Sequence, residues 1–217
     1  MTSIAIVGAT GATGLLVVDQ ALARGWEVTA LVRRAAALDE RPRLSVVVGD
    51  PLDPAEAAAG IGAADAVVSV IGWRRRLRGP STTTVYSRCA AALTTALAER
   101  GTGRVVFCTS AGVEPHDPGE AWPYRHIVKP LWLAPGYDDM RRAEDVVRAS
   151  GVEWVLVRPV RLSNGPPTGR TVVSERFRPP HAAFLSRADL AAFLLEQVVV
   201  DDWLGGTPTI AGRRDHD

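Results

Sequence analysis

The chain has 217 residues, of which 47% are hydrophobic and 23% are charged, a balance typical of a globular domain that buries one core. The net charge of +1 gives no global attraction to nucleic acid or a membrane surface, and no apolar run approaches the roughly 20 residues of a membrane-spanning helix. Two cysteines without a metal or redox spacing fit a reduced compartment, and the chain opens directly on a predicted strand rather than a signal peptide. We therefore expect one cytoplasmic domain over residues 1–217, a monomer or homodimer, with neither nucleic acid nor a membrane as partner.

The first predicted element is a buried strand at residues 4–7, followed by three glycines and a helix that ends near Arg24. Gly8 lets the chain turn out of the strand, Gly11 lets the backbone approach a pyrophosphate, and Gly14 lets the helix pack closely on the sheet. A second strand at residues 27–32 comes at the distance of a βαβ unit. The pattern predicts a dinucleotide site on the helix N-terminus, with a plain strand–turn–helix as the alternative.

Strand and helix patterns alternate along the rest of the chain. Further strands are predicted at 44–48, 66–71, 104–108 and 152–157, and helices at 83–100 and 137–150, the latter with Asp138 and Asp139 in its first turn. Ser186 with Asp189 forms a capping box before a last helix that ends near Val198. The alternation predicts a single α/β domain, a Rossmann-like doubly wound parallel sheet with helices on both faces, which binds ligands beyond the carboxyl ends of its strands.

Two long segments interrupt this alternation, at about 113–136 and 161–182, and both follow the carboxyl end of a predicted strand. Segments of this length inside a compact domain are usually functional or disordered, and we expect both to be substrate loops. Trp122, Tyr124, His126 and Trp132 in the first segment are expected to form a lid over a flat, aromatic small-molecule substrate. Local hydrophobic packing is the alternative for these four side chains.

The residues after the second strand indicate which cofactor binds. A protein that prefers NAD usually carries an acid there for the ribose 2′-hydroxyl, whereas this chain carries Arg33 and Arg34. A guanidinium pairs with a 2′-phosphate and stacks on adenine, so NADP(H) is expected, with NADPH preferred over NADH. A solvated arginine pair is the alternative. Asp50 and Leu52 lie where the adenine would be met, although Asp50 also fits a turn before Pro51.

Five stretches together resemble a known family. They are Gly-Ala-Thr-Gly-Ala-Thr-Gly at 8–14, Leu-Val-Arg at 31–33, Gly-Asp at 49–50, Cys-Thr-Ser-Ala at 108–111, and Ala-Ser-Gly-Val-Glu-Trp-Val-Leu-Val-Arg-Pro at 149–159. With them, the chain resembles the atypical short-chain dehydrogenase/reductase proteins that bind NAD(P)H, and most closely the biliverdin-IXβ reductase/flavin reductase type. The resemblance covers nearly the whole chain. It implies the fold and the cofactor, but not the substrate, because such folds host many functions.

The resemblance also implies a set of cofactor contacts along one edge of the sheet. In chain order these residues are Gly8, Thr10, Gly11, Ala12, Thr13, Arg33, Arg34, Asp50, Leu52, Ile71, Gly72, Thr109, Ser110, Pro159 and Val160. The first five would meet the pyrophosphate, the arginines the 2′-phosphate, and the last four the nicotinamide end. A second arginine of such reductases is Ala37 here, which weakens the preference for NADPH unless Arg34 replaces it.

Classical members of the superfamily use a Tyr-x-x-x-Lys pair, in which the lysine lowers the tyrosine pKa so that the phenol can protonate a carbonyl oxygen. None of the three tyrosines has a lysine four residues on, and the only lysine, Lys129, follows Arg125 at that spacing. Tyr137 remains a catalytic candidate, with Arg141 as its electrostatic partner. The missing pair favours an acceptor that stabilises its own anion, such as a flavin, quinone or linear tetrapyrrole, because water can then supply the proton.

Two further residues are catalytic candidates. Ser110 is expected to hold the nicotinamide or the acceptor by its hydroxyl, unless it caps the following turn. Arg161 stands where the biliverdin-type relatives have a histidine, and could bind an acidic substrate or an oxyanion, unless it is a solvated loop arginine. A second histidine of those relatives corresponds to Met140. The arginine-rich run 74–78 is either a solvated face or a means of steering anions.

The four histidines have no metal-binding spacing, so no metal is expected. The leading hypothesis is an NADPH-dependent oxidoreductase that transfers hydride to a planar conjugated acceptor. One alternative is a tailoring ketoreductase, epimerase or isomerase that works on a polycyclic intermediate. The other is a non-catalytic sensor of NADP(H), similar to NmrA.

Overall fold

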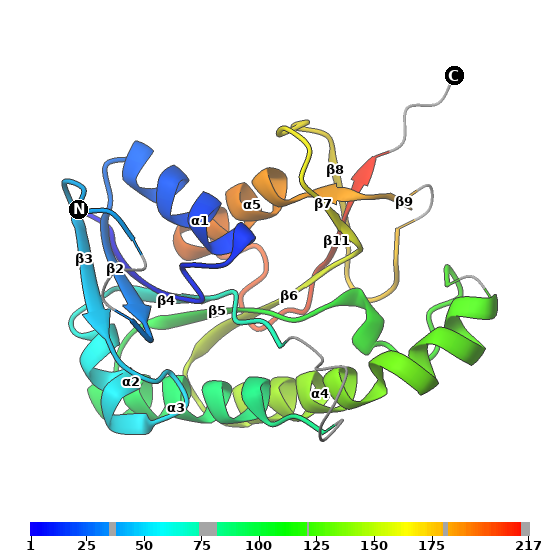
Figure 1. The fold of residues 1–217 in the computed structure, drawn as a ribbon, viewed down its shortest axis with the longest axis horizontal. Helices are drawn as coiled ribbons and strands as arrows, with labels where there is room; N and C mark the ends of the chain where they lie inside the picture. The colour runs from blue at the N-terminus through cyan, green and yellow to red at the C-terminus, as the bar shows by residue number, and fades with distance from the viewer. Residues whose placement is uncertain (35–37, 74–81, 121, 180–181, 214–217) are drawn as a thin grey trace.

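A computed structural model describes residues 1–34, 38–73, 82–120, 122–179 and 182–213. Within these residues, nine strands form one sheet, whose first six strands are all parallel (Figure 1). These six are β1 (Ser3–Val7), β2 (Glu27–Val32), β3 (Leu44–Val48), β4 (Ala66–Ser69), β5 (Arg104–Cys108) and β6 (Glu153–Pro159). Their order across the sheet is β3-β2-β1-β4-β5-β6, so the chain runs outward to one side and then returns to β1 to run outward on the other. The predicted doubly wound Rossmann-like fold is confirmed.

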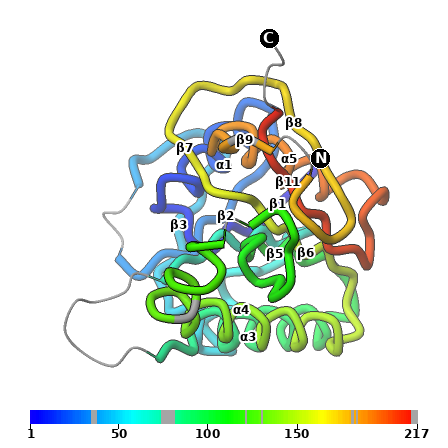
Figure 2. Tube along the Cα trace, turned by 90° about the vertical axis from the view of Figure 1, so that its right-hand side faces the viewer, coloured from blue at the N-terminus to red at the C-terminus, as the bar shows by residue number. Residues whose placement is uncertain are grey.

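Helices cover both faces of this sheet. The helices α1 (Ala12–Ala23) and α5 (Arg187–Val199) pack together on one face, and α2 (Pro54–Ile61), α3 (Val85–Arg100) and α4 (Ala134–Ala149) cover the other (Figure 1). In the view turned by 90°, α3 and α4 lie side by side beneath the strands (Figure 2). Alternate residues of each strand face opposite layers: Ile4 and Ile6 of β1 belong to the α1/α5 core, and Ala5 and Val7 to the α2–α4 core. No helix among the described residues is long and apolar enough to cross a membrane.

The segment 161–182, expected to be a substrate loop, includes short strands. It contains β7 (Leu162–Ser163) and β8 (Thr171–Ser174), and it leads into β9 (Ala182–Ala183) and β10 (Leu185–Ser186). The strand β11 (Thr209–Arg213) lies parallel to β6 and pairs antiparallel with β8 and β9, while β7 pairs with β10. The short β-branched run in β8 gains its stability from a partner 35 or more residues away, which no local pattern indicates.

The segment 113–136 is also more regular than predicted. After a short 3₁₀ turn, η2 (Ala111–Val113), the chain forms a π-helical segment, η3 (Tyr124–Leu133), which continues directly into α4. Its prolines suggested a loop, but Pro123 is the N-cap of η3 and Pro135 lies in the first turn of α4. As Figure 1 shows, η3 projects from the body of the domain beyond the carboxyl end of β5.

Because α4 begins at Ala134, Asp138 and Asp139 lie beyond its first turn, contrary to the prediction. The Asp139 carboxylate is instead fully buried and caps the N-terminus of the neighbouring helix α3. It accepts hydrogen bonds from the Tyr86 amide at 2.9 Å and from the Ser87 hydroxyl at 2.5 Å. A cap from another helix fixes how α3 and α4 dock. At α5 the predicted cap is confirmed, since the Ser186 hydroxyl accepts a hydrogen bond from the Asp189 amide at 3.0 Å.

Candidate active site

The predicted cofactor residues follow the carboxyl ends of β1 to β6, and the sheet order brings these ends side by side along one edge. The point where the strand order reverses lies between β1 and β4. In open α/β sheets, ligands bind in the crevice at such a reversal. Gly8 and Val70 meet there: a Cβ atom on Gly8 would lie 2.8 Å from the Val70 carbonyl oxygen, and Gly8 has a φ of +86°. Only glycine fits both constraints at this position.

The remaining glycines bring α1 close to the turn. A Cβ on Gly14 would lie 2.1 Å from the Gly8 carbonyl oxygen, whereas a Cβ on Gly11 would lie 3.3 Å from it. The Gly11 amide donates a hydrogen bond to the same carbonyl at 3.0 Å. Gly14 is therefore required for the close packing of helix on turn, while the space beside Gly11 is left for a ligand.

The N-terminus of α1 suits an anion. Its N-cap residue, Gly11, has no side chain that could accept a hydrogen bond from the first helical amides. Thr10 and Ala12 are exposed and Thr13 is half-buried, so these amides open on solvent. Helix amides and the positive end of the helix dipole stabilise phosphate groups. The crowded turn and the open helix end fit the diphosphate of a dinucleotide.

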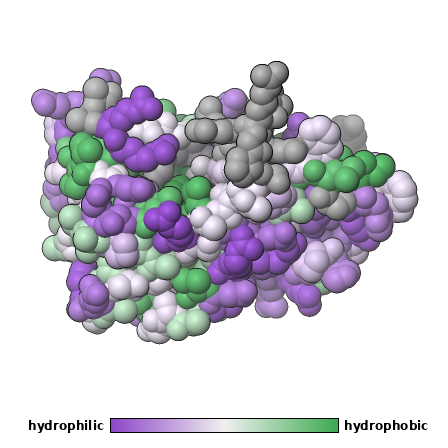
Figure 3. Space-filling view, turned by 60° about the horizontal axis from the view of Figure 1, so that its bottom comes forward, coloured by the Kyte–Doolittle hydropathy of each residue, from purple (hydrophilic) through white to green (hydrophobic). Residues whose placement is uncertain are grey.

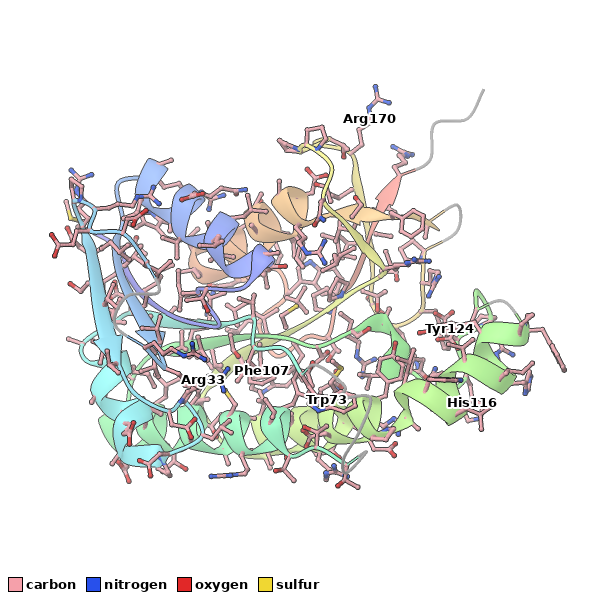
Figure 4. The ribbon with its side chains drawn as sticks, viewed as in Figure 1. Arg33, Trp73, Phe107, His116, Tyr124 and Arg170 are labelled. Atoms are coloured by element: carbon pink, nitrogen blue, oxygen red, sulfur yellow. The ribbon has the colours of Figure 1, made fainter. Side chains whose placement is uncertain are left out.

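Arg33 and Arg34 follow the carboxyl end of β2 and are exposed, and Figure 4 labels Arg33. Ala37 and the arginine run 74–78 lie outside the described residues. The Asp50 carboxylate accepts a hydrogen bond from the Leu52 amide at 3.1 Å, the contact expected of a turn residue. Its second oxygen can still accept from an adenine amino group, so that contact stays a prediction.

At the end of β4, Ile71 is half-buried and Gly72 is exposed, and a Cβ on Gly72 would meet no described atom within 4 Å. Trp73 ties this end to the helices below. Its amide donates to the Tyr86 hydroxyl at 3.1 Å, and its ring would lie 3.2 Å from a Cβ on Gly136. The chain is thus held on one side of the strand end and open on the other.

At the end of β5, Thr109 and Ser110 differ in what their hydroxyls can do. The buried Thr109 hydroxyl donates to the Glu144 carboxylate at 2.8 Å, so it points into the protein. The Ser110 hydroxyl accepts a hydrogen bond from the Gly112 amide at 3.2 Å, which is the turn-capping contact. A hydroxyl can accept and donate at once, and that contact leaves the Ser110 proton for a ligand.

The carboxylate that holds Thr109 belongs to a buried ion pair between α4 and β6. Glu144 is fully buried and accepts hydrogen bonds from Arg158 Nε at 2.9 Å and Arg158 Nη2 at 2.5 Å. With the Thr109 hydroxyl and the two Arg158 nitrogens, Arg148 Nη2 makes a fourth donor, at 2.8 Å. A buried ion pair of this kind strongly penalises the loss of either partner, because the other charge is left without water or counter-charge. The pair fixes the ends of β5 and β6 relative to α4.

At the end of β6, Pro159 and Val160 are buried. The Val160 amide donates to the Ile210 carbonyl at 3.0 Å and its side chain packs in the core, so its carbonyl oxygen is the group left for a ligand. Arg161 is exposed, and its guanidinium lies 5.1 Å from the ring centroid of Phe184. Phe184, whose side chain is 57% exposed, was not predicted from the sequence and adds an aromatic face beside Arg161.

The structure gives Tyr137 a partner other than the predicted Arg141. The Tyr137 and Tyr124 hydroxyls lie 2.7 Å apart, whereas Arg141 donates to the Val113 carbonyl at 3.0 Å and pairs with Asp138. The Tyr137 ring packs directly on Gly112, where a Cβ would lie 2.3 Å from the ring. Tyr137 therefore lies against the turn that follows Ser110.

The sequence spacing excluded a tyrosine–lysine pair, but the fold forms a contact of this kind in space. The Lys129 ammonium lies 5.8 Å from the centroid of the Tyr137 ring, although Lys129 precedes Tyr137 by eight residues. The same ammonium donates to the Glu114 carbonyl at 2.6 Å and to the two Glu120 carboxylate oxygens at 3.0 and 3.1 Å. The Lys129 charge is therefore already paired with Glu120.

The structure shows the partners of three of the four aromatic residues expected to form a lid. Trp122 is 66% exposed and stacks on His126, with ring centroids 5.1 Å apart, while Tyr124 is directed to Tyr137. Ile127 and Leu131 of η3 are also exposed. Figure 3 shows hydrophobic residues at the right-hand end of the molecule, beside hydrophilic ones.

A groove lies away from the carboxyl edge of the sheet. A groove of about 580 Å³ lies at the opposite edge, near the amino ends of β4 to β6, and is lined by Arg100, Arg104 and Glu153 among others. Within the described part of the chain, no three His, Cys, Asp or Glu side chains come together in a way that could hold a metal ion.

Comparison with known proteins agrees with this geometry. A family model described as NAD(P)H-binding matches residues 8–200, nearly the whole chain. An uncharacterised chloroplastic protein of Arabidopsis thaliana is 29% identical over 179 residues, which cover 77% of this chain and 62% of that protein. The chain thus spans about three fifths of the length of this relative.

Two solved structures share the fold. The anaerobillin reductase ChuY of Escherichia coli O157:H7 superposes with a TM-score of 0.79 at 22% identity and full coverage of both chains. A provisionally assigned NADH-flavin reductase of Streptococcus pneumoniae TIGR4 superposes with a TM-score of 0.76 at 21% identity, over 98% of this chain and 100% of that one. At these identities the likeness establishes the fold alone.

Proposed function

Because the chain belongs to the NAD(P)H-binding family, we propose that it is an NADPH-dependent oxidoreductase that transfers hydride to a planar conjugated acceptor such as a flavin, quinone or linear tetrapyrrole. The observation that carries the proposal is the glycine turn. Gly14 packs α1 against the Gly8 carbonyl, and Gly11 leaves the first amides of α1 open to a diphosphate.

Each end of the cofactor has residues suited to it. The amides of Ala12 and Thr13 bind the diphosphate, and Arg33 with Arg34 pairs with the 2′-phosphate, which makes NADPH the preferred form. When bound, the reduced nicotinamide supplies the hydride. Ser110 donates its free hydroxyl proton to the carboxamide or to the acceptor, and so orients the two reactants.

Arg161 and Phe184 support a flat, electron-poor or anionic acceptor. The guanidinium and the exposed ring offer a charge and an aromatic face at the carboxyl end of β6, next to the proposed nicotinamide position. The names of the structural neighbours, an anaerobillin reductase and a flavin reductase, refer to acceptors of this kind. We extend that acceptor class to this chain as part of the proposal.

A tailoring reductase or isomerase that acts on a carbonyl compound is the second candidate. The observation in its favour is the hydroxyl contact between Tyr124 and Tyr137, because a phenol can protonate a carbonyl oxygen that water would protonate slowly. The two candidates share the cofactor site and differ in whether a side chain must deliver the proton.

The test is oxidation of NADPH, followed by loss of nicotinamide absorbance, with FMN, riboflavin, a quinone and biliverdin offered separately and NADH run in parallel. We expect turnover with at least one acceptor, stronger with NADPH, and lower in Ser110→Ala. The matched control is Ser150→Ala, since Ser150 caps the far end of α4 and only donates to the Val147 carbonyl. Tight NADPH binding without turnover on any acceptor would refute the reductase and favour a non-catalytic sensor.

A further inference from the structure

The helical segment that projects beyond β5 exposes a cluster of large apolar side chains. Single exposed apolar residues are normal on a protein surface, whereas a cluster of them marks a contact site. Of the eleven large hydrophobic residues that are exposed within the described part of the chain, five lie between positions 122 and 132. We call these five side chains the outer face of η3: Trp122, Ile127, Val128, Leu131 and Trp132.

The helical geometry gathers these side chains on one side. Hydrogen bonds in a π-helix run between residues five apart, so residues four or five apart share a face. Trp122, Ile127 and Leu131 follow each other at spacings of five and four. Val128 and Trp132 lie four apart, next to this row. Because η3 extends away from the body of the domain, the outer face is accessible to another molecule (Figure 1).

The inner side of η3 is polar, which is the reverse of an ordinary surface helix. The buried Lys129 ammonium donates to the Glu114 carbonyl oxygen at 2.6 Å and to the buried Glu120 carboxylate at 3.0 Å. Arg125 is half-buried and donates to the Asp117 carbonyl oxygen. Burial of an ion pair costs solvation free energy, and exposed tryptophan and leucine side chains contribute no burial of apolar surface. The inverted pattern therefore indicates that the outer face is covered by a partner.

The charges of η3 distinguish a membrane from a protein partner. Helices that bind membrane surfaces combine an apolar face with exposed lysines and arginines, which attract anionic lipids. Both cations of η3, Arg125 and Lys129, are instead directed to acceptors within the domain. An apolar face without charges needs no complementary charges on its partner, so it can pair with a copy of itself across a two-fold axis.

The exposed area fits such a dimer. The exposed fractions of the five side chains amount to about 600 Å² of accessible surface. A two-fold contact between two outer faces would therefore bury about 1,200 Å², the lower end of the range for specific interfaces. Trp122 and Trp132 belong to the residue type that contributes most often to the binding energy of such interfaces.

We propose that two copies of this chain form a symmetric dimer in which the outer face of one η3 packs on the outer face of the other. The inference concerns assembly and does not depend on the proposed function. Since η3 continues directly into α4, the dimer contact would also hold the segment that follows the turn at Ser110.

The test is sedimentation velocity of the full chain between about 1 and 300 μM, because dimer formation depends on concentration. We expect the parent to dimerise with a Kd in the micromolar range. Leu131→Arg should raise this Kd at least about 100-fold, because each copy would then bury a charge without a partner. The matched control is Val199→Arg, since Val199 is 55% exposed at the end of α5, away from η3. The control should leave the Kd within about twofold.

Sedimentation with lipid vesicles separates a second copy from a membrane as the partner. The vesicles are neutral phosphatidylcholine alone, or phosphatidylcholine with about 30% anionic phosphatidylserine. We expect the parent to bind neither. Vesicle binding by the parent that is lost in Leu131→Arg would overturn the proposal and assign the outer face to a lipid surface.

Two further results would overturn it. They are a parent that stays monomeric up to the highest concentration, and a dimer whose Kd is the same in Leu131→Arg as in the parent. Far-UV circular dichroism and thermal unfolding establish that each variant is folded. If Leu131→Arg does not fold, Ile127→Arg on the same face takes its place, with the same expected loss of the dimer.

Discussion

We expect alanine at Gly14 to reduce mainly the stability of the fold, and alanine at Gly11, three residues earlier, to reduce mainly cofactor binding. In Gly14→Ala, the new Cβ would begin 2.1 Å from the Gly8 carbonyl oxygen, about 0.9 Å closer than the 3.0 Å below which such contacts essentially never occur. The atoms met are backbone, so the helix or the turn must move. In Gly11→Ala, the Cβ lies 3.3 Å from the same oxygen, and the φ of −78° suits alanine.

The free energy of unfolding should reflect this difference. Overpacking costs about 1–3 kcal/mol, and the better helix propensity of alanine returns at most about 1 kcal/mol, so Gly14→Ala should lose about 1–2 kcal/mol. For a chain of this size, that lowers Tm by about 2–8 °C. Gly11→Ala should lose less than about 1 kcal/mol, the cost of a poorer N-cap, since its methyl group meets only the Gly8 carbonyl oxygen, at 3.3 Å.

Gly11→Ala should affect the binding of NADPH more than it affects the free energy of unfolding. Its methyl group stands where the diphosphate approaches the amides of α1, so we expect Kd to rise at least about tenfold, or about 1.4 kcal/mol, at near-normal stability. Thermal unfolding with and without NADPH measures both quantities on each variant. The reasoning fails if Gly11→Ala binds NADPH as the parent does, or if Gly14→Ala unfolds at the parent Tm.

Three further predictions follow from single contacts. Arg33→Ala should raise the Kd for NADPH about tenfold or more while the Kd for NADH changes less than about twofold, and equal losses for both cofactors would exclude a 2′-phosphate contact. Glu144→Leu should lower the free energy of unfolding by about 3–5 kcal/mol, because the buried Arg158 guanidinium loses its hydrogen-bonded counter-charge and keeps only the Glu114 carboxylate at 3.8 Å. Adding Arg158→Met should restore most of the loss, and a chemical-denaturation cycle in which the double variant is no more stable than the single one would contradict this. Burial alone would raise the pKa of Asp189, but the hydrogen bonds that it accepts from Thr168, Gly169 and Ser186 outweigh burial and lower it. The carboxylate therefore stabilises the fold above about pH 4, and this stabilisation is lost as the pH falls through the lowered pKa. The difference in unfolding free energy between the parent and Asp189→Asn should shrink in acid, and a difference independent of pH would contradict this.

The central sheet could be predicted from the sequence because its strands are locally encoded. The bounds of β2, β3 and β5 agree with the prediction to the residue, since each is a run of apolar, mostly β-branched residues that ends at glycine or a polar turn. Helix α2 was missed although its signal is present: Asp53 accepts from the Ala55 and Glu56 amides, and Pro54 follows it. Strand β11 was missed because its pairing partners lie far away in the chain.

The candidate site also has one part that could be predicted from local sequence and one part that could not. The glycine turn and the arginines after β2 follow from spacing, because a single βαβ unit determines where they lie. The Tyr124–Tyr137 contact and the approach of Lys129 depend on a π-helical segment that the prolines concealed. Contacts between side chains of two different elements depend on the angle at which the elements pack, and sequence periodicity does not predict that angle.

The cap that Asp139 places on α3 also bears on the order in which the chain folds during synthesis. The Tyr86 amide has its hydrogen-bond acceptor, the Asp139 carboxylate, 53 residues further along the chain. At about 5–20 residues per second, a ribosome needs roughly 3–11 s to add them. During that interval the first turn of α3 lacks the Asp139 carboxylate as its hydrogen-bond acceptor, so this helix end is frayed and accessible to chaperones and proteases. The helix end becomes capped only when α4 docks on α3.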